Sequence, residues 1–124
     1  MIKIFAVEDI HQLRLLEELL EENLAKGSYR LESRPDLSDE GFYHSELPRD
    51  FDLYWMHLSA VEVGIPEEIK QSQPWSKIVV RQAMGDNEKT RAYLKKKGID
   101  AILNDEEGLN RDKIIRTFRN LGIE

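Results

Sequence analysis

Apolar residues along this chain gather in five short runs separated by longer polar stretches. The runs cover residues 2–7, 28–34, 51–58, 77–83 and 99–103. Short runs rich in Ile, Val and aromatic residues are typical of strands that are covered on both faces of a sheet. The run at 28–34 alternates moderately between apolar and polar residues, which also indicates a strand. Trp55, in the third run, is expected in the core.

The stretches after these runs predict helices. Between Asp9 and Gly27, leucines recur at helical spacing with Glu and Gln in between, and Gly27 is the expected stop. Pro66 indicates the start of another helix. Residues 87–98 and 108–122 predict two more, the first ended by Gly98, and Ser38 to Glu46 predicts a short one.

Five strands that alternate with five helices predict an α/β fold, a doubly wound parallel sheet with helices on both faces. The flavodoxin-like strand order 2-1-3-4-5 is common at this size. Ligands of such folds bind at the carboxyl ends of the strands, next to the switch point between the first and third strands. Glu8 and Asp9 end the first predicted strand, and His57 ends the third.

The composition narrows the class of protein. With 124 residues, 40% of them hydrophobic, residues 1–124 form one ordinary domain. We find no apolar run long enough for a membrane span and no secretory signal pattern, so we expect a cytoplasmic protein without membrane contact. The absence of cysteine excludes disulfides and thiolate chemistry.

Charge is distributed unevenly. The net charge of −6 argues against nucleic-acid binding. Residues 1–62 hold six Lys and Arg against fourteen Asp and Glu, whereas residues 63–124 hold twelve against ten. Cations of the second half cluster on its last two predicted helices, where they form either a solvated face or a docking patch.

Four segments resemble the receiver domain of two-component response regulators. They are "IFAVEDI", "FDLYWMH", "KIVVRQAMGD" and "KKKGIDAIL", at the places of the first, third, fourth and fifth strands of that family. The resemblance covers the whole chain and implies the receiver fold. It also implies that Glu8 and Asp9 correspond to the acidic pair that holds Mg²⁺ in the family.

The position of the family's phosphoacceptor aspartate holds a different residue. Counting along the third strand places His57 there, or Met56 if the register slips by one residue. Asp52 begins that strand, about five residues and therefore well over 10 Å from the acidic pair. It cannot act as the acceptor.

Three further positions depart from the family. Gln82 stands in place of the Ser or Thr that ends the fourth strand, and Asn104 or Asp105 in place of the Lys after the fifth. Ile102 replaces the aromatic residue of the fifth strand. The cation that should pair with a phosphoryl group is therefore missing.

Three interpretations of His57 follow. We favour a partly buried imidazole that hydrogen-bonds to Glu8 or Asp9 and takes the place of the metal or the phosphoryl group. Glu8, Asp9 and His57 together could instead bind Zn²⁺, Mn²⁺ or Fe²⁺, with Mg²⁺ a further candidate cation. His57 could also accept a phosphoryl group itself. Arg81 is expected to pair with Asp9 or Asp105, or to extend along the end of the sheet.

These observations predict a degenerate receiver, or pseudo-receiver, that is a signalling module rather than an enzyme and needs no cofactor. Its predicted surface for an acidic protein partner, or for self-association, lies on the fourth helix, fifth strand and fifth helix. That surface comprises Arg91, Lys95, Lys97, Ile102, Arg111, Arg116 and Arg119. The alternatives are a metal-dependent or atypically phosphorylated receiver that uses Glu8, Asp9 and His57, and a flavodoxin-like domain that binds a small ligand.

Overall fold

A computed structural model describes residues 1–8, 10–34, 48–57, 61, 64–82, 88–104 and 111–122. Its elements in chain order are β1 (Ile2–Val7), α1 (Ile10–Asn23), β2 (Tyr29–Arg34), β3 (Leu53–His57), α3 (Ile65–Ser72), β4 (Lys77–Gln82), α4 (Glu88–Lys96), β5 (Ala101–Asn104) and α5 (Arg111–Asn120). No helix in these ranges is long and apolar enough to cross a membrane.

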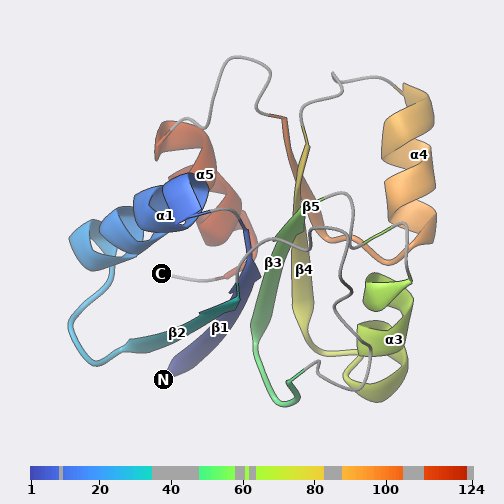
Figure 1. Cartoon of the computed structure of the whole chain (residues 1–124). Helices are drawn as coiled ribbons and strands as arrows, with labels where there is room; N and C mark the ends of the chain where they lie inside the picture. Colours follow the sequence, from blue (N-terminus) through green and yellow to red (C-terminus); the bar gives the residue numbers. More distant parts are fainter. Residues whose placement is uncertain are drawn as a thin grey trace.

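The five strands form one parallel sheet in the order β2-β1-β3-β4-β5, as the sequence predicts. Helices α1 and α5 cover one face, and α3 and α4 cover the other (Figure 1). This arrangement follows from the right-handed crossovers that parallel neighbours require. The strands β1, β3 and β4 lie at the centre, so their carboxyl ends meet at one edge of the sheet.

Alternate residues of each strand build two separate apolar clusters. On the α1/α5 face, Ile4, Leu53 and Trp55 are completely buried and pack with Leu16, Leu20 and Ile114 from the two helices. On the α3/α4 face, residues of the other parity, such as Tyr54 and Ile78, pack with Ile65, Ile69 and Leu94. The nearly continuous apolar runs in the sequence are explained by this burial on both faces.

The predicted helices differ in detail from those observed. Helix α1 ends at Asn23, before the predicted stop at Gly27, which lies in the following turn with φ +84°. Pro66 lies in the first turn of α3, as predicted, and Gly98 follows α4 with φ +88°. The short helix predicted between Ser38 and Glu46 lies outside the described residues.

A buried polar network lies below the amino end of β3. The Tyr54 hydroxyl lies 2.9 Å from the carbonyl oxygen of Pro48, to which it donates, and 3.1 Å from Oε1 of Gln73. The same Gln73 oxygen accepts a hydrogen bond from the backbone N–H of Asp50 at 2.7 Å. Burial is the main cause that raises the pKa of Tyr54 above its usual value. This network fixes the chain where it enters β3.

Lys70 ties α3 to the loop before β5. Its ammonium donates to the carbonyl oxygen of Ser76 at 2.7 Å and to Oδ2 of Asp100 at 2.8 Å. The same Asp100 oxygen accepts the backbone N–H of Ile78 at 2.8 Å. A β-carbon on Gly98 would lie 3.0 Å from Cγ of Lys70, so this lysine packs closely on the turn after α4.

Candidate functional site: a buried ion pair at the carboxyl edge of the sheet

Three residues, Glu8, His57 and Arg81, lie at the carboxyl edge of the sheet. Val7 of β1 is paired in register with Met56 of β3, so Glu8, which follows Val7, lies beside the end of β3. His57 is the register partner of Arg81 on β4. Glu8 and Arg81 continue the rows of alternate residues that face α1 and α5, because they lie two residues after Ala6 and Val79 of that cluster.

The Glu8 carboxylate is completely buried and accepts hydrogen bonds from Arg81 and Trp55. Arg81 donates from Nε to Oε2 at 2.5 Å and from Nη2 to Oε1 at 2.7 Å, which is a bidentate ion pair. The indole Nε1 of Trp55 donates to Oε2 at 3.1 Å. Arg81 itself is only 7% exposed, so a cation and an anion compensate one another inside the protein.

The ion-pair partner of Arg81 differs from the two that its sequence context predicts. We expected Asp9 or Asp105 as its ion-pair partner, but both lie outside the described residues, and the ion pair observed is with Glu8. Trp55 is buried in the core, as predicted, and it also donates the hydrogen bond to Glu8. The sequence does contain a sign of this pair, because side chains alternate between the two faces of a strand. Once the strand register is known, Glu8, Trp55 and Arg81 fall on the same face of the sheet.

His57 ends β3 as predicted and is partly exposed. The predicted hydrogen bond from His57 to Glu8 or Asp9 stays a prediction, since the partners described for the Glu8 carboxylate are Arg81 and Trp55. Met56, the alternative at this position, is buried in the cluster on the α3/α4 face. The register thus favours His57 as the residue at the end of the strand.

The other departures from the receiver pattern lie side by side on neighbouring strands. Gln82 is almost completely buried and is the register partner of Asn104, the last residue of β5. Ile102 is partly buried and packs against the cluster on the α3/α4 face. The structure therefore brings Gln82 and Asn104 together, while Asp105 lies outside the described residues.

The described residues do not fit a metal ion bound through Glu8. Both carboxylate oxygens already accept charge-assisted hydrogen bonds from the Arg81 guanidinium, which stays protonated at every accessible pH. A divalent cation beside this carboxylate would have to displace the guanidinium or lie next to its positive charge. Among the side chains that the structure describes, no group of three His, Cys, Asp or Glu could hold a metal.

The predicted partner surface divides into two parts. Arg91, Lys95 and Ile102 line a shallow cavity of about 220 Å³ between α4 and β5. Arg111 instead forms an ion pair with Glu22 of α1, with 2.6 Å between Nη2 and Oε1, and Arg119 lines a cavity between α1 and α5.

Two further members of the predicted surface can be placed. Lys97 is only partly exposed, and its Nζ lies 3.8 Å from Oε2 of Glu67. Arg116 is exposed on α5. The part of the predicted surface that forms one contiguous patch is thus Arg91, Lys95 and Ile102, which we call the α4–β5 patch.

Comparison with known proteins identifies the fold. No family model and no curated protein matches the chain. Among solved structures, one similar protein is the response regulator DrrB of Thermotoga maritima, an OmpR/PhoB homolog. It superposes with a TM-score of 0.70 at 18% sequence identity, and the match covers 100% of this chain and 55% of the DrrB chain. The chain therefore spans about half of that regulator, whereas it spans 97% of the structure of the BeF3-activated DrrB receiver domain alone.

Two other structures give the same result. A CheY-like receiver domain protein from Methanospirillum hungatei JF-1 has a TM-score of 0.70 at 17% identity, and the match covers 98% of this chain and 94% of that one. A putative pilus assembly-related protein from Burkholderia pseudomallei K96243 has a TM-score of 0.69 at 16% identity, with 98% and 89% covered. The chain has the fold of response-regulator receiver domains, as the resemblance predicted.

Proposed function

We propose that this chain is a cytoplasmic signalling module of the receiver type that acts without aspartyl phosphorylation. The observation that carries the proposal is the buried ion pair between Glu8 and Arg81. In this ion pair the Arg81 guanidinium binds Glu8, which the resemblance to receiver domains would otherwise make a metal ligand. The chain would then have no catalytic activity of its own and would act by binding.

The chemistry of phosphoryl transfer supports this view. Transfer to an aspartate needs a carboxylate nucleophile, a divalent cation and a cationic or hydroxyl group for the developing charge. The last residues of β3, β4 and β5 are His57, Gln82 and Asn104, which are neither carboxylates nor permanent cations. Arg81 is cationic, but its charge is committed to Glu8.

A metal and beryllofluoride titration tests the proposal. Trp55 donates to Glu8, so its emission is expected to report any metal that reaches this carboxylate. Trp75, which is 60% exposed, is removed by W75F so that Trp55 is the single tryptophan. We expect no change in Trp55 emission with Mg²⁺, with or without beryllofluoride, and no phosphoprotein after incubation with acetyl phosphate.

A matched control shows that the assay can detect binding. The variant H57D/R81S adds a carboxylate at the end of β3 and removes the guanidinium from Glu8, whose Oε2 still accepts the hydrogen bond from Trp55. We expect Mg²⁺ to change Trp55 emission in this variant. A saturable Mg²⁺ response of the W75F protein, or phosphorylation of His57, would instead support the metal-dependent or atypically phosphorylated receiver and reject our proposal.

The α4–β5 patch is the surface that we assign to the partner. Arg91 and Lys95 are exposed cations beside the partly buried Ile102, a combination that suits an acidic protein segment with an apolar residue. Once a partner has been isolated, K95E should slow its association, and added salt should slow the wild type. An association rate that is independent of salt would remove the acidic partner from the proposal.

A further inference from the structure

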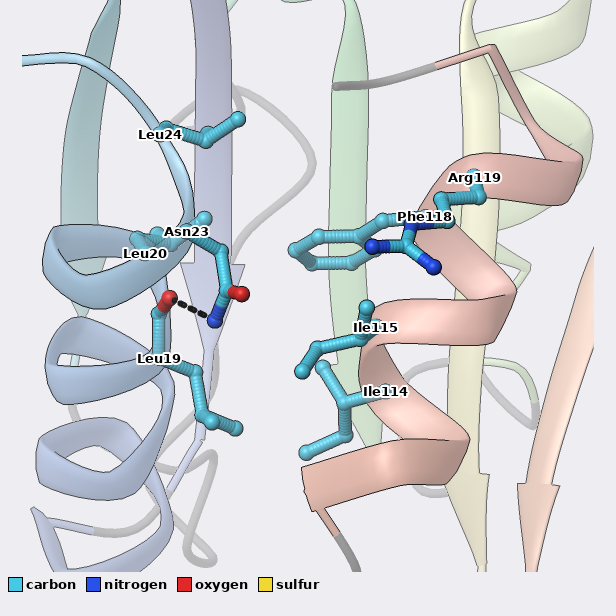
Figure 2. Close-up of a pocket in the computed structure, with 8 residues that line it drawn as sticks. All are labelled: Leu19, Leu20, Asn23, Leu24, Ile114, Ile115, Phe118 and Arg119. Atoms are coloured by element: carbon cyan, nitrogen blue, oxygen red, sulfur yellow. Dashed lines mark hydrogen bonds between the residues drawn. The ribbon is translucent and has the colours of Figure 1, made fainter.

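A cavity opens between the two helices that cover one face of the sheet (Figure 2). Its volume is about 420 Å³, which is within the usual range of small-molecule sites. The lining residues are Leu19, Leu20, Asn23, Leu24, Ile114, Ile115, Phe118 and Arg119. None of them belongs to the ion pair at the carboxyl edge, so this cavity is a separate feature.

The walls of the cavity belong to the protein's own core. Leu19, Leu20 and Ile114 are at most 2% exposed, and Leu24 and Phe118 are 8% and 7% exposed. A helix from a partner would need a broad apolar surface, which these residues do not offer to solvent. A hollow with buried apolar walls fits the apolar body of a small molecule better.

Two polar groups at the cavity define the chemistry of the ligand. Arg119 turns its guanidinium toward the gap between the helices (Figure 2), and this guanidinium makes no ion pair or hydrogen bond within the part of the chain that the structure describes. Asn23 donates from Nδ2 to the carbonyl oxygen of Leu19 at 2.8 Å. The Asn23 amide oxygen can therefore accept a hydrogen bond from a ligand.

The charges around the cavity favour a ligand with one negative charge. On α5, Arg111 is paired with Glu22, so its charge is already compensated. Helix α1 also exposes Glu18 and Glu21. One guanidinium beside an acidic helix suits a carboxylate better than a doubly charged phosphate.

We propose that this cavity binds a small amphipathic carboxylate. The apolar body lies between the leucines of α1 and the Ile114, Ile115 and Phe118 side chains of α5, and the carboxylate binds the Arg119 guanidinium. A hydroxyl or amide N–H of the ligand would donate to Asn23. The site lies beyond the proposed signalling function and does not depend on it.

The cavity has a direct optical reporter. The Phe118 ring packs edge-on against Trp55, with 6.2 Å between the ring centroids and an angle of 88°. Trp55 also donates to Glu8, so it joins the cavity wall to the buried ion pair. A ligand that shifts Phe118 should change the emission of Trp55.

Sodium decanoate is a suitable probe. In the W75F protein we expect a saturable change in Trp55 emission, and equilibrium dialysis with labelled decanoate should give the same affinity. R119Q should weaken decanoate binding about 10- to 100-fold, because a charge-assisted hydrogen bond contributes about 1.5–3 kcal/mol. R116Q, which removes an exposed cation of α5 outside the cavity, should bind decanoate as the parent does.

A neutral analogue and a blocking variant complete the experiment. The alcohol 1-decanol should bind the parent and R119Q equally, and I115F should weaken both ligands because it fills the cavity. Absence of saturable decanoate binding by dialysis, or an R119Q affinity within twofold of the parent, would overturn the proposal. Binding of an acidic apolar peptide without decanoate binding would also overturn it.

Discussion

Removal of Arg81 should destabilise the protein strongly. In R81M the Glu8 carboxylate loses both donors of the guanidinium and keeps the hydrogen bond from Trp55. Since Glu8 is completely buried, loss of its cationic partner should lower the free energy of unfolding by about 3–5 kcal/mol. With a urea dependence of about 1.5 kcal/mol/M, the midpoint of unfolding should fall by about 2–3 M.

The double variant E8Q/R81M separates a buried charge from a general packing defect. It removes both charges and keeps an acceptor for the Trp55 indole, so most of the loss should be recovered. Wild type, E8Q, R81M and E8Q/R81M are compared by urea unfolding followed by far-UV circular dichroism, which does not depend on the emission of Trp55. The coupling energy of Glu8 and Arg81 follows from the cycle.

R116M is the matched control, because Arg116 is exposed on α5. Its free energy of unfolding should stay within about 0.5 kcal/mol of the wild type. The predicted role of Arg81 is wrong if the free energy of unfolding of R81M falls by less than about 1 kcal/mol, or if E8Q/R81M is no more stable than R81M. Either result would mean that the Glu8 charge is satisfied without Arg81.

Two further predictions concern the rest of the fold. Burial raises the pKa of Tyr54 in the folded protein above its value of about 10 in the unfolded chain. The stability that Tyr54 contributes is therefore fully present below pH 10 and is lost as the pH rises through the folded-state pKa. The melting temperature of wild type should therefore fall more steeply above pH 10 than that of Y54F, and parallel curves would contradict this assignment. G98A should lower the free energy of unfolding by about 1–2 kcal/mol, because Gly98 has a left-handed backbone. The loss should be larger than in G122A, whose added β-carbon meets no atom within 4 Å. Equal losses in urea unfolding would show that the close contact with Lys70 is relieved without cost.

The order and position of the strands could be predicted because burial on both faces leaves a strong local pattern. "IKIFAV" and "KIVVRQ" are strands at the predicted places, and Pro66 lies in the first turn of α3. The end of α1 was predicted less well: Ala25 and Lys26 are compatible with a helix, and the sequence does not show that the chain leaves the helix after Asn23.

The partners of the buried charges could not be predicted from local patterns. Glu8 and Arg81 are 73 residues apart, and Glu8 follows β1 whereas Arg81 lies on β4, with β3 between these strands, so their contact depends on the register of three strands. Arg81 inside an apolar run was the visible sign of a buried cation. The sequence offered several acidic partners near the same edge, and only the three-dimensional structure distinguishes Glu8 among them.

The strand order also leaves β2 at the rim of the sheet, where it pairs with β1 on one side and with no described strand on the other. Exposed rims of this kind can recruit strands from other molecules and start aggregation. In β2, Arg30 and Glu32 alternate with apolar residues, and their side chains are 58% and 39% exposed. Their charges give the rim an intrinsic protection against unwanted strand addition, which should help the protein to remain dispersed at high concentration.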